Sequence, residues 1–561
     1  MAFKYDGNIS KTLLSATASN SDETPAEFIG KATDARHHHS HTNTSILGNV
    51  FFVAIQLLFY LEIGDASAPV PYRKLGGISL ECGGVFLTVS SLWRTPSNGR
   101  GIRDSELEMN WEMACDETPE WGVPNWVGLF AKDPTLNVNQ TPIIRIEIKD
   151  HPWGFFKTNV TYSKQYFPNG WSKGTAITTG DDVDDYVPPN VSDVSTGPHC
   201  MPHWIASFKD NTLIKANCLK IQPTWMQDHR SQLGWLPLKS LFIPGTHNSG
   251  CFYKGSQLNR RDTFQRYILT QDRDIWSQLV HGIRYLDFRV GYYSSSSSST
   301  NDSTNNSADS SIYSSYKLVL NNMYKYIKKM YSHVLNLFVS GKSTKYEELW
   351  INHDLVRVTP LLPLIRDIRR FLEISKEEIV ILDFHRFPVG FQGRPQRHQI
   401  LLDMIQKELG HLIIPPIKSG PLGPKLNDIW ATGQQLIICY GDNDIVQENS
   451  WLWSPLHQFW GNQQTPMGLK TYLQNVMINP PRNEKNPMWA AMAQLTPTTI
   501  DVMFKPSGSL RHMADSINRN LTTWVRTKWW RLANIVATDF FLGNNIIDLA
   551  INSNVYKVKF P

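Results

Sequence analysis

Short apolar runs that end in a charged or titratable residue recur through the second half of the chain. Such runs lead to His247, Arg289, His353, Asp383 and Asp539. Apolar runs of this length, bounded by turn residues, are typical of buried strands. In a (β/α) barrel the chemistry lies at the C-terminal ends of the strands. The pattern therefore predicts an α/β, TIM-barrel-like domain whose functional residues gather at one end.

Helical periodicity separates two of these runs. Apolar residues recur at helical spacing from 361 to 372, with charged residues between them. The apolar strand 379–384 follows at once, and right-handed crossovers of this strand–helix–strand type build parallel sheets. We therefore assign the barrel to residues 223–561.

An insertion interrupts the predicted barrel at residues 292–346. Its first half is a tract of Ser, Asn and Thr that cannot bury a core. Its second half, 316–338, is a helix candidate rich in Tyr, Lys and Leu. Long insertions of this kind are either functional or unstructured. Two interpretations stay open: a lid or membrane-facing flap beside the site, or a tolerated surface insertion.

Alternation with a period of two dominates residues 69–222. Ile144, Ile146 and Ile148 alternate with charged residues, which predicts a half-buried strand. Gly, Pro and Asn separate several such runs at short intervals, as in an antiparallel β-sandwich. We predict an all-β sandwich module that precedes the barrel. It carries no catalytic constellation, so we interpret it as a binding or packing module whose protein partner is unknown.

The first 68 residues differ from the rest. Residues 1–45 are polar and include a His-rich run, which we interpret as a disordered leader rather than a metal site. The window 46–63 is strongly apolar, and Ala66-Ser67-Ala68 has the form of a signal-peptidase site. Residues 46–68 are therefore predicted to be a signal peptide or a signal anchor, with a buried core helix as the alternative.

Sequons and cysteines also favour export. N-glycosylation sequons follow the apolar window at Asn139, Asn159, Asn190, Asn301, Asn305 and Asn520. The six cysteines have no metal-type spacing, and four of them fall between 82 and 218. This distribution predicts one or two disulfides in the N-terminal module, or else a reduced, buried set. We expect the secretory pathway, with the catalytic domain extracellular or lumenal.

Composition narrows the possible partners. Hydrophobic residues make up 41% of the chain and charged residues 19%, which is globular composition with ample core. The net charge of +5 is diluted over 561 residues, and no dense Lys/Arg block occurs, so nucleic acid is not an expected partner. The 19 Trp suit lipid or carbohydrate contacts as well as large cores.

The strand-end residues suggest phosphodiester cleavage without a metal. Of two histidines, one takes a proton from an attacking hydroxyl and the other gives one to the leaving oxygen. An arginine fork suits the phosphate oxygens, and a buried aspartate can fix a histidine tautomer. The candidates for these roles are His247, His353, Arg289 and Asp539.

Four motifs also carry a family resemblance: Pro244-Gly245-Thr246-His247-Asn248-Ser249, Leu286-Asp287-Phe288-Arg289, Asn352-His353-Asp354 and Val380-Ile381-Leu382-Asp383-Phe384. Their ordered series resembles the X domain of phosphatidylinositol-specific phospholipase C, in particular the X-domain-only proteins. The resemblance covers about residues 223–561. It implies a distorted TIM barrel in which the inositol 2-hydroxyl attacks the phosphate of an inositol phospholipid or a glycosyl-phosphatidylinositol anchor. The products would be diacylglycerol and an inositol phosphate, cyclic or ring-opened.

The same resemblance implies individual roles. His247 would be the general base, paired with Asp539, and His353 the general acid. Arg289 would bind the phosphate in place of a carboxylate that the calcium-dependent relatives need. We therefore predict no calcium requirement and no cofactor, although Asp287 and Asp383 are carboxylates close by in the motifs. Substrate-binding candidates are Asn248, Asp287, Asp383, Tyr440 and Gln494, with His385 as the alternative inward residue beside Asp383.

Other readings remain open. A metal-dependent glycerophosphodiesterase or sphingomyelinase-D-like barrel would need an acidic cluster where the motif ending at Arg289 offers only one acid. A lipid-binding protein with a lapsed site belongs to a different class. An aromatic stretch could dip into a membrane interface or pack in the core, and it contains Trp451, Trp453, Phe459 and Trp460.

Overall fold

The computed structural model describes most of the chain beyond residue 83. The described residues are 84–94, 104–113, 123–137, 139–149, 151–162, 167–173, 176–179, 182–186, 194–252, 264–294, 346, 348–479, 486–504 and 508–559. Residues Gly76–Pro561 form one compact unit, separate from Met1–Leu75. The predicted leader 1–45, the apolar segment 46–68 and nearly all of the insertion lie outside the described residues.

A parallel sheet that wraps onto itself is the centre of the fold. The first and last strands of the C-terminal part, β10 (Ile243–Thr246) and β18 (Ile535–Thr538), pair in parallel. The strand order is β15–β14–β11–β10–β18–β17–β16, with parallel pairing at every step. The remaining bounds are β11 (Tyr285–Tyr292), β14 (Val380–Val389), β15 (Leu436–Tyr440), β16 (His457–Phe459) and β17 (Trp489–Met492). The prediction of an α/β, TIM-barrel-like fold is confirmed.

The barrel is open on one side. Among the described residues, no strand pairing joins β15 to β16.

On the closed side β10 lies tightly against β11. A Cβ atom at Gly245 would stand 2.7 Å from the ring of Tyr285, so only glycine fits at this point of β10.

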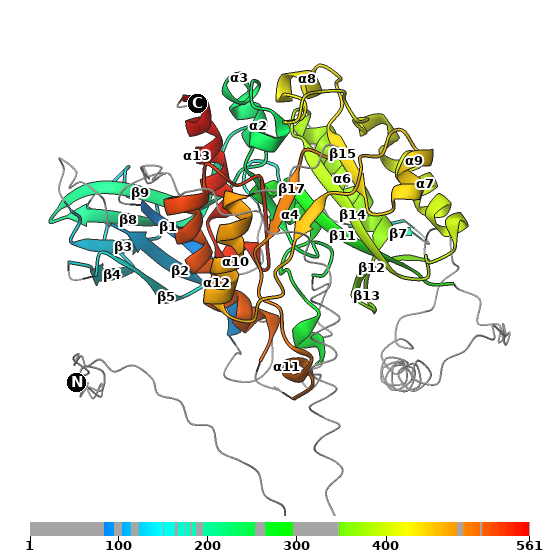
Figure 1. The fold of residues 1–561 in the computed structure, drawn as a ribbon. Helices are drawn as coiled ribbons and strands as arrows, with labels where there is room; N and C mark the ends of the chain where they lie inside the picture. Colours follow the sequence, from blue (N-terminus) through cyan, green and yellow to red (C-terminus); the bar gives the residue numbers. More distant parts are fainter. Residues whose placement is uncertain are drawn as a thin grey trace, which may run out of the picture. The chain divides into compact units, whose positions relative to one another are not determined.

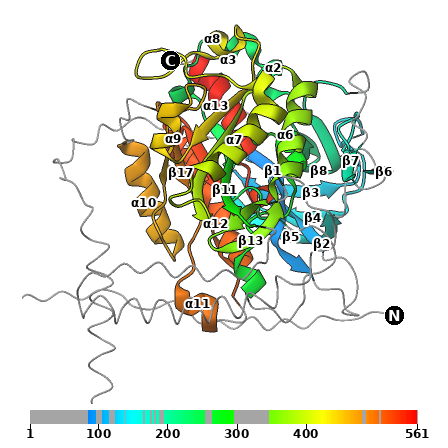
Figure 2. The same ribbon diagram turned by 90° about the vertical axis from the view of Figure 1, so that its right-hand side faces the viewer.

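Helices cover the outer face of the barrel strands (Figures 1 and 2). Helix α6 (Leu361–Ser375) buries the apolar stripe predicted for 361–372 and ends at Lys376, whose φ is +53°. The other helices are α2 (Trp225–Asp228), α3 (Arg230–Leu233), α4 (Ile275–His281), α7 (Pro395–Leu409), α8 (Leu426–Trp430), α9 (Asn443–Glu448), α10 (Pro466–Ile478), α11 (Thr499–Phe504), α12 (Leu510–Trp524) and α13 (Ile546–Lys559). Short helical turns are η2 (Leu238–Ser240), η3 (Phe264–Tyr267), η4 (Gly410–Leu412), η5 (Val525–Trp529) and η6 (Phe541–Gly543).

The strand that carries His353 corrects one prediction. We expected His353 on a barrel strand, but β12 (Leu349–His353) pairs antiparallel with the outer part of β11 and with β13 (Val356–Pro360). The reason is local: Asp354 has a φ of +51° and turns the chain back at once, so no crossover helix follows β12. The hairpin β12–β13 therefore extends the barrel sheet at its edge.

The segment before the barrel is all β. It forms a three-stranded sheet, β1–β2–β5, and a four-stranded sheet, β4–β3–β8–β9, both antiparallel. The bounds are β1 (Gly84–Arg94), β2 (Asp104–Glu112), β3 (Trp126–Phe130), β4 (Ile144–Glu147), β5 (Trp153–Tyr162), β6 (Ala176–Thr179), β7 (Asp182–Tyr186), β8 (His199–Lys209) and β9 (Thr212–Ile221). Buried residues of both sheets share one hydrophobic cluster with α4 and α6. That these sheets form an independent sandwich module stays a prediction.

One predicted disulfide is present. Cys200 on β8 is bonded to Cys218 on β9, and Cys251 and Cys439 are free and buried. The other two cysteines lie outside the described residues. None of the helices in the described ranges is long and apolar enough to cross a membrane.

Candidate active site

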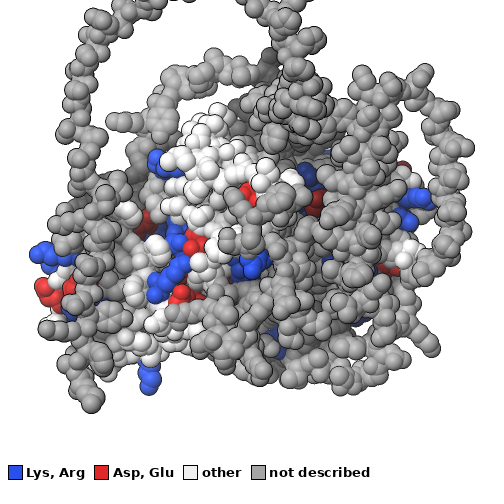
Figure 3. Space-filling model, turned by 90° about the horizontal axis from the view of Figure 1, so that it is seen from below, with Lys and Arg blue, Asp and Glu red and all other residues white. Residues whose placement is uncertain are grey.

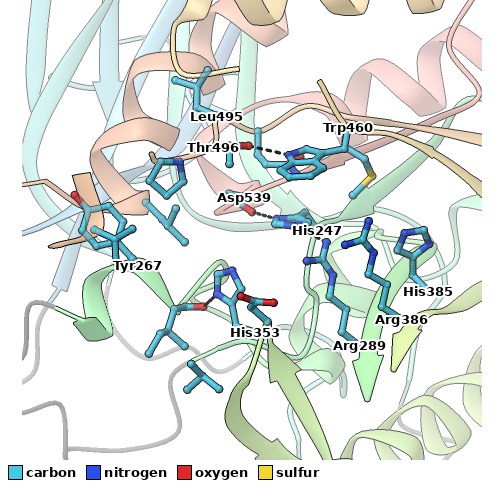
Figure 4. Close-up of a pocket in the computed structure, with 18 of the residues that line it drawn as sticks. His247, Tyr267, Arg289, His353, His385, Arg386, Trp460, Leu495, Thr496 and Asp539 are labelled. Carbon is cyan, nitrogen blue, oxygen red and sulfur yellow. Dashed lines mark hydrogen bonds and ion pairs between the residues drawn. The ribbon is translucent and has the colours of Figure 1, made fainter. Parts of the chain in front are cut away.

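A cavity of about 530 Å³ opens at the C-terminal ends of the barrel strands. Figure 4 shows part of its lining, and the cavity as a whole is lined by residues of β11, β12, β14, β16 and β17, by the residues that follow β10 and β18, and by other loop and helix residues. Lining residues that bear on the chemistry are His247, Arg289, His353, His385, Arg386, Gln458, Gln494 and Asp539. Seen from the side of α11, described basic and acidic side chains lie close together among uncharged ones (Figure 3).

His247 and Asp539 form a buried pair. Nδ1 of His247 lies 2.8 Å from Oδ1 of Asp539. Burial raises the pKa of the Asp539 carboxyl above its usual range, and its hydrogen bond with His247 opposes that rise. An acceptor at this position requires the proton on Nδ1, so the neutral imidazole presents an unprotonated Nε2. This is the tautomer that a general base needs.

Arg289 lies beside Nε2 of His247, which accepts a hydrogen bond from it. Its Nη2 is 3.0 Å from His247 Nε2 and 3.4 Å from Oδ2 of Asp287. Burial alone would raise the pKa of Asp287, but the positive charge of Arg289 holds it at about 2. Asp287 also accepts from the backbone N–H of Asn248 at 3.0 Å. The guanidinium is thus fixed by an ionised carboxylate next to the base, where it can bind an anion.

His353 faces the cavity from the hairpin. Its Nδ1 donates to the carbonyl of Ile268, which leaves Nε2 as the nitrogen that can meet a substrate (Figure 4). Burial, together with the nearby His247 and Arg289, lowers the pKa of His353 to about 3. Without a ligand this histidine is therefore neutral at physiological pH.

A second polar layer lies beneath the cavity floor. Gln458 Nε2 donates to Asp383 Oδ2 at 3.1 Å, to Asp287 Oδ1 at 3.1 Å and to the hydroxyl of Tyr285 at 2.8 Å. Tyr285 in turn donates to Asp383 at 2.8 Å. Burial and the charge of Asp287 raise the pKa of Asp383 to about 8, so Asp383 is protonated at neutral pH. Burial lowers the pKa of the neighbouring His385 to about 4.

The structure places the predicted substrate-binding residues at different positions relative to the cavity. Gln494 lines the cavity, and its Oε1 has no hydrogen-bond partner among the described residues. Asn248 is 1% exposed, with a φ of +44°, and its side chain likewise has no described partner. Asp287 and Asp383 lie buried beneath the cavity rather than in its lining.

Tyr440 is not brought to the site. Its hydroxyl is 2.7 Å from Nδ1 of His398 on α7, and its ring packs on the outer side of the sheet. The register explains this placement: Asp383 pairs with Cys439, whereas Tyr440 pairs with Phe384. Because side chains alternate along a strand, Tyr440 faces the helices and Cys439 the barrel interior.

Several lining residues were not singled out from the sequence. Gln458 lies on a three-residue strand, β16, which is too short to leave a periodic signal. Arg386 follows the alternative inward residue His385, and both line the cavity. Within the aromatic stretch, Trp453 is 3% exposed and packs in the core, whereas Trp460 is 45% exposed and lies at the cavity. The two interpretations of this stretch thus apply to different residues.

Asp287 and Asp383 of the predicted motifs already have partners within the protein. Asp287 is already 3.4 Å from the Arg289 guanidinium, and Asp383 carries a proton at neutral pH. Within the described ranges, no group of three or more His, Cys, Asp or Glu side chains could hold a metal ion. Divalent cations such as calcium need several ionised oxygen ligands.

The site and the fold define an α/β barrel protein whose cavity, at the C-terminal ends of the strands, is lined by two histidines and an arginine. No protein-family model matches the chain. Curated relatives do: the chain is 23% identical to human PI-PLC X domain-containing protein 1 over 61% of this chain and 96% of that protein. It is also 23% identical to zebrafish (Danio rerio) PI-PLC X domain-containing protein 3 over 59% of this chain and 93% of that protein.

Solved structures give a weaker likeness. The phosphatidylinositol-specific phospholipase C of Staphylococcus aureus has a TM-score of 0.38 and 11% identity, over 57% of this chain and 93% of that chain. The enzyme of the same name from Listeria monocytogenes has a TM-score of 0.38 and 16% identity, over 59% and 98%. The relatives named PI-PLC X domain-containing protein confirm the resemblance found in the motifs.

Proposed function

We propose that this protein is a phosphoric diester hydrolase of the phospholipase C type that acts on inositol phospholipids without a metal. The observation that carries the proposal is the pairing of His247 with Asp539 at 2.8 Å, with Nη2 of Arg289 3.0 Å from Nε2 of the same histidine. A base, its orienting carboxylate and an anion-binding guanidinium are thus assembled at one point of the cavity. The relationship to PI-PLC X domain-containing proteins supports the lipid class.

The chemistry follows from the two imidazole nitrogens that face the cavity. Nε2 of His247 would take the proton of the inositol 2-hydroxyl, whose oxygen attacks the phosphorus. His353 would give its Nε2 proton to the departing diacylglycerol oxygen, and the phosphate is left as a cyclic diester of inositol. Water then opens the ring, with the two histidines in exchanged roles. Arg289 would balance the charge that grows on the phosphate oxygens.

His353 needs a proton before it can serve as the acid. Its pKa of about 3 in the free site is set first by burial and then by the positive charges around it. A bound phosphodiester brings a negative charge beside Arg289 and reverses part of that effect. We therefore propose that binding of the substrate raises the pKa of His353, which then takes up a proton from solvent and can serve as the acid. The remaining candidates for headgroup contact are Gln494, Gln458 and Arg386, which line the same cavity.

A secretory location is part of the proposal. The Cys200–Cys218 disulfide supports it, because disulfides persist in oxidising compartments. Asn139, Asn159 and Asn520, which belong to three of the six sequons, are exposed. The substrate would then be an inositol phospholipid or a glycosyl-phosphatidylinositol anchor at a membrane surface.

The test is release of water-soluble inositol phosphate from phosphatidylinositol vesicles, with and without a chelator. We expect turnover that resists the chelator and falls at least about 100-fold in His247→Ala and His353→Ala. His411→Ala is the matched control, because His411 is an exposed histidine away from the cavity. Turnover that stops with the chelator would refute the metal-free mechanism, and binding of the lipid without turnover would indicate a lipid-binding protein.

A further inference from the structure

The turn that follows Asp539 is held in an unfavourable backbone conformation. Phe540 has φ +46° and ψ +59°, in the left-handed region that a non-glycine residue rarely adopts. Such a residue costs about 1–2 kcal/mol, so its surroundings must hold it. One restraint is the hydrogen bond from the Phe540 N–H to the carbonyl of Thr270 at 2.8 Å. This turn sets where the Asp539 carboxylate lies relative to His247.

A single buried amide holds the other side of the turn. Nδ2 of Asn518, on α12, donates to the carbonyl of Asp539 at 3.1 Å and to that of Phe540 at 3.3 Å. The Asn518 side chain is itself fixed, because its Oδ1 accepts from Nδ2 of Asn544 at 3.1 Å. Asn518 is 1% exposed, so water cannot replace these bonds.

The same amide connects the turn to the N-terminal β segment. Nδ2 of Asn518 also lies 3.2 Å from the hydroxyl of Ser91, a residue of β1 that is 2% exposed. The carbonyl of Ser91 accepts from Arg511 at 3.0 Å, and the Arg511 guanidinium lies 4.3 Å from the ring centre of Phe540. Strand β1 is therefore connected to the turn through two side chains, the amide of Asn518 and the guanidinium of Arg511.

We infer that Asn518 is a positioning residue for the His247–Asp539 pair, and that Ser91 of the N-terminal β segment is part of its support. This inference rests on the proposed function. Release of the turn would let the Asp539 carboxylate move away from Nδ1 of His247, and a displacement of about 1 Å in a catalytic group can cost about 100-fold in rate. The N-terminal β segment then helps to hold the His247–Asp539 pair of the barrel in place.

The experiment compares Asn518→Ala with Asn110→Ala in the full chain. Asn110 is a matched control, because it is a buried asparagine of the β segment whose amide donates to Thr88 and to the carbonyl of Glu108, away from the turn. We expect Asn518→Ala to lower kcat about 10- to 100-fold with KM within about twofold, and Asn110→Ala to leave both unchanged. Ser91→Ala, a smaller change, should lower kcat less than about tenfold.

A second readout needs no substrate. The Nδ1 proton of His247 gives a downfield NMR resonance while it is shared with Asp539, and Asn518→Ala should shift or broaden it whereas Asn110→Ala should not. An unchanged resonance and kcat in Asn518→Ala would overturn the inference, as would equal losses in both asparagine variants. If the wild-type protein turns over no lipid but the resonance responds as expected, the proposed function fails and the positioning role stands.

Discussion

The low pKa of His353 leads to a measurable prediction about substrate binding. Lowering the pKa of a histidine from 6.5 to about 3 means that protonation of His353 in the free cavity costs about 5 kcal/mol more than in water. A phosphodiester charge about 4 Å away contributes about 4 kcal/mol at an effective dielectric constant of 20. The two effects nearly cancel, so His353 should take up a proton from solvent when the anion binds.

The assay is calorimetric titration of the wild-type protein with a phosphonate analogue of glycerophosphoinositol, a soluble anion that it cannot cleave, so that His247 keeps its influence on His353. Titrations in buffers of different ionisation enthalpy give the number of protons taken up. We expect about half a proton at pH 6, falling towards zero as the pH rises above 7. Adding His353→Ala should abolish the uptake, and adding His411→Ala should leave it unchanged. A binding enthalpy that is the same in every buffer, or an uptake that survives without His353, would refute the reasoning.

Four further predictions follow from single contacts. Asp539→Asn should lower kcat at least about 100-fold, with little change in KM, because the amide no longer holds the required tautomer of His247; an unchanged kcat in the vesicle assay would contradict the pairing. Burial raises the pKa of Asp383 to about 8, so the contribution of Asp383 to stability is full below pH 4 and is lost as the pH rises to 8. In denaturant unfolding, Asp383→Asn should remove a few kcal/mol from the change in unfolding free energy between these pH values. A dependence of the unfolding free energy on pH equal to that of wild type would argue against a protonated Asp383. Cys200→Ala with Cys218→Ala opens a loop of 18 residues and should cost about 3 kcal/mol in the free energy of unfolding, while activity at 25 °C stays near wild type. Trp460→Ala should weaken sedimentation with phosphatidylinositol vesicles but leave binding of glycerophosphoinositol within about twofold; equal losses in both would mean that Trp460 contacts the headgroup.

The sequence predicted the barrel from the strand ends because parallel, buried strands leave continuous apolar runs. The runs before His247 and Asp539 became β10 and β18, whose pairing closes the sheet and brings the two residues together. The same signal could not separate a barrel strand from a hairpin strand. The run that ends at His353 is equally apolar, and only the turn at Asp354 distinguishes it.

The positions of the substrate-binding candidates were harder to predict than those of His247 and Asp539. The choice of Tyr440 failed by one position along β15, a distinction that depends on strand register rather than on residue type. Gln458 bonds to both Asp287 and Asp383, yet its strand is three residues long and its neighbours are aromatic. Contacts of this kind join segments that are far apart in the sequence, so the local pattern of apolar and polar residues does not predict them.

The hairpin β12–β13 places the two histidines of the cavity on different parts of the sheet. His247 is anchored in the closed side of the barrel, whereas His353 stands on a two-stranded extension at the sheet edge that is entered directly from the insertion after β11. His353 is nevertheless tied to the rest of the site, because its Nδ1 donates to the carbonyl of Ile268, two residues before the Thr270 carbonyl that holds the turn after Asp539. Under the proposed function, substitutions in the hairpin would bear first on the leaving-group side of the reaction, and substitutions in the Ile268–Thr270 segment would bear on both sides.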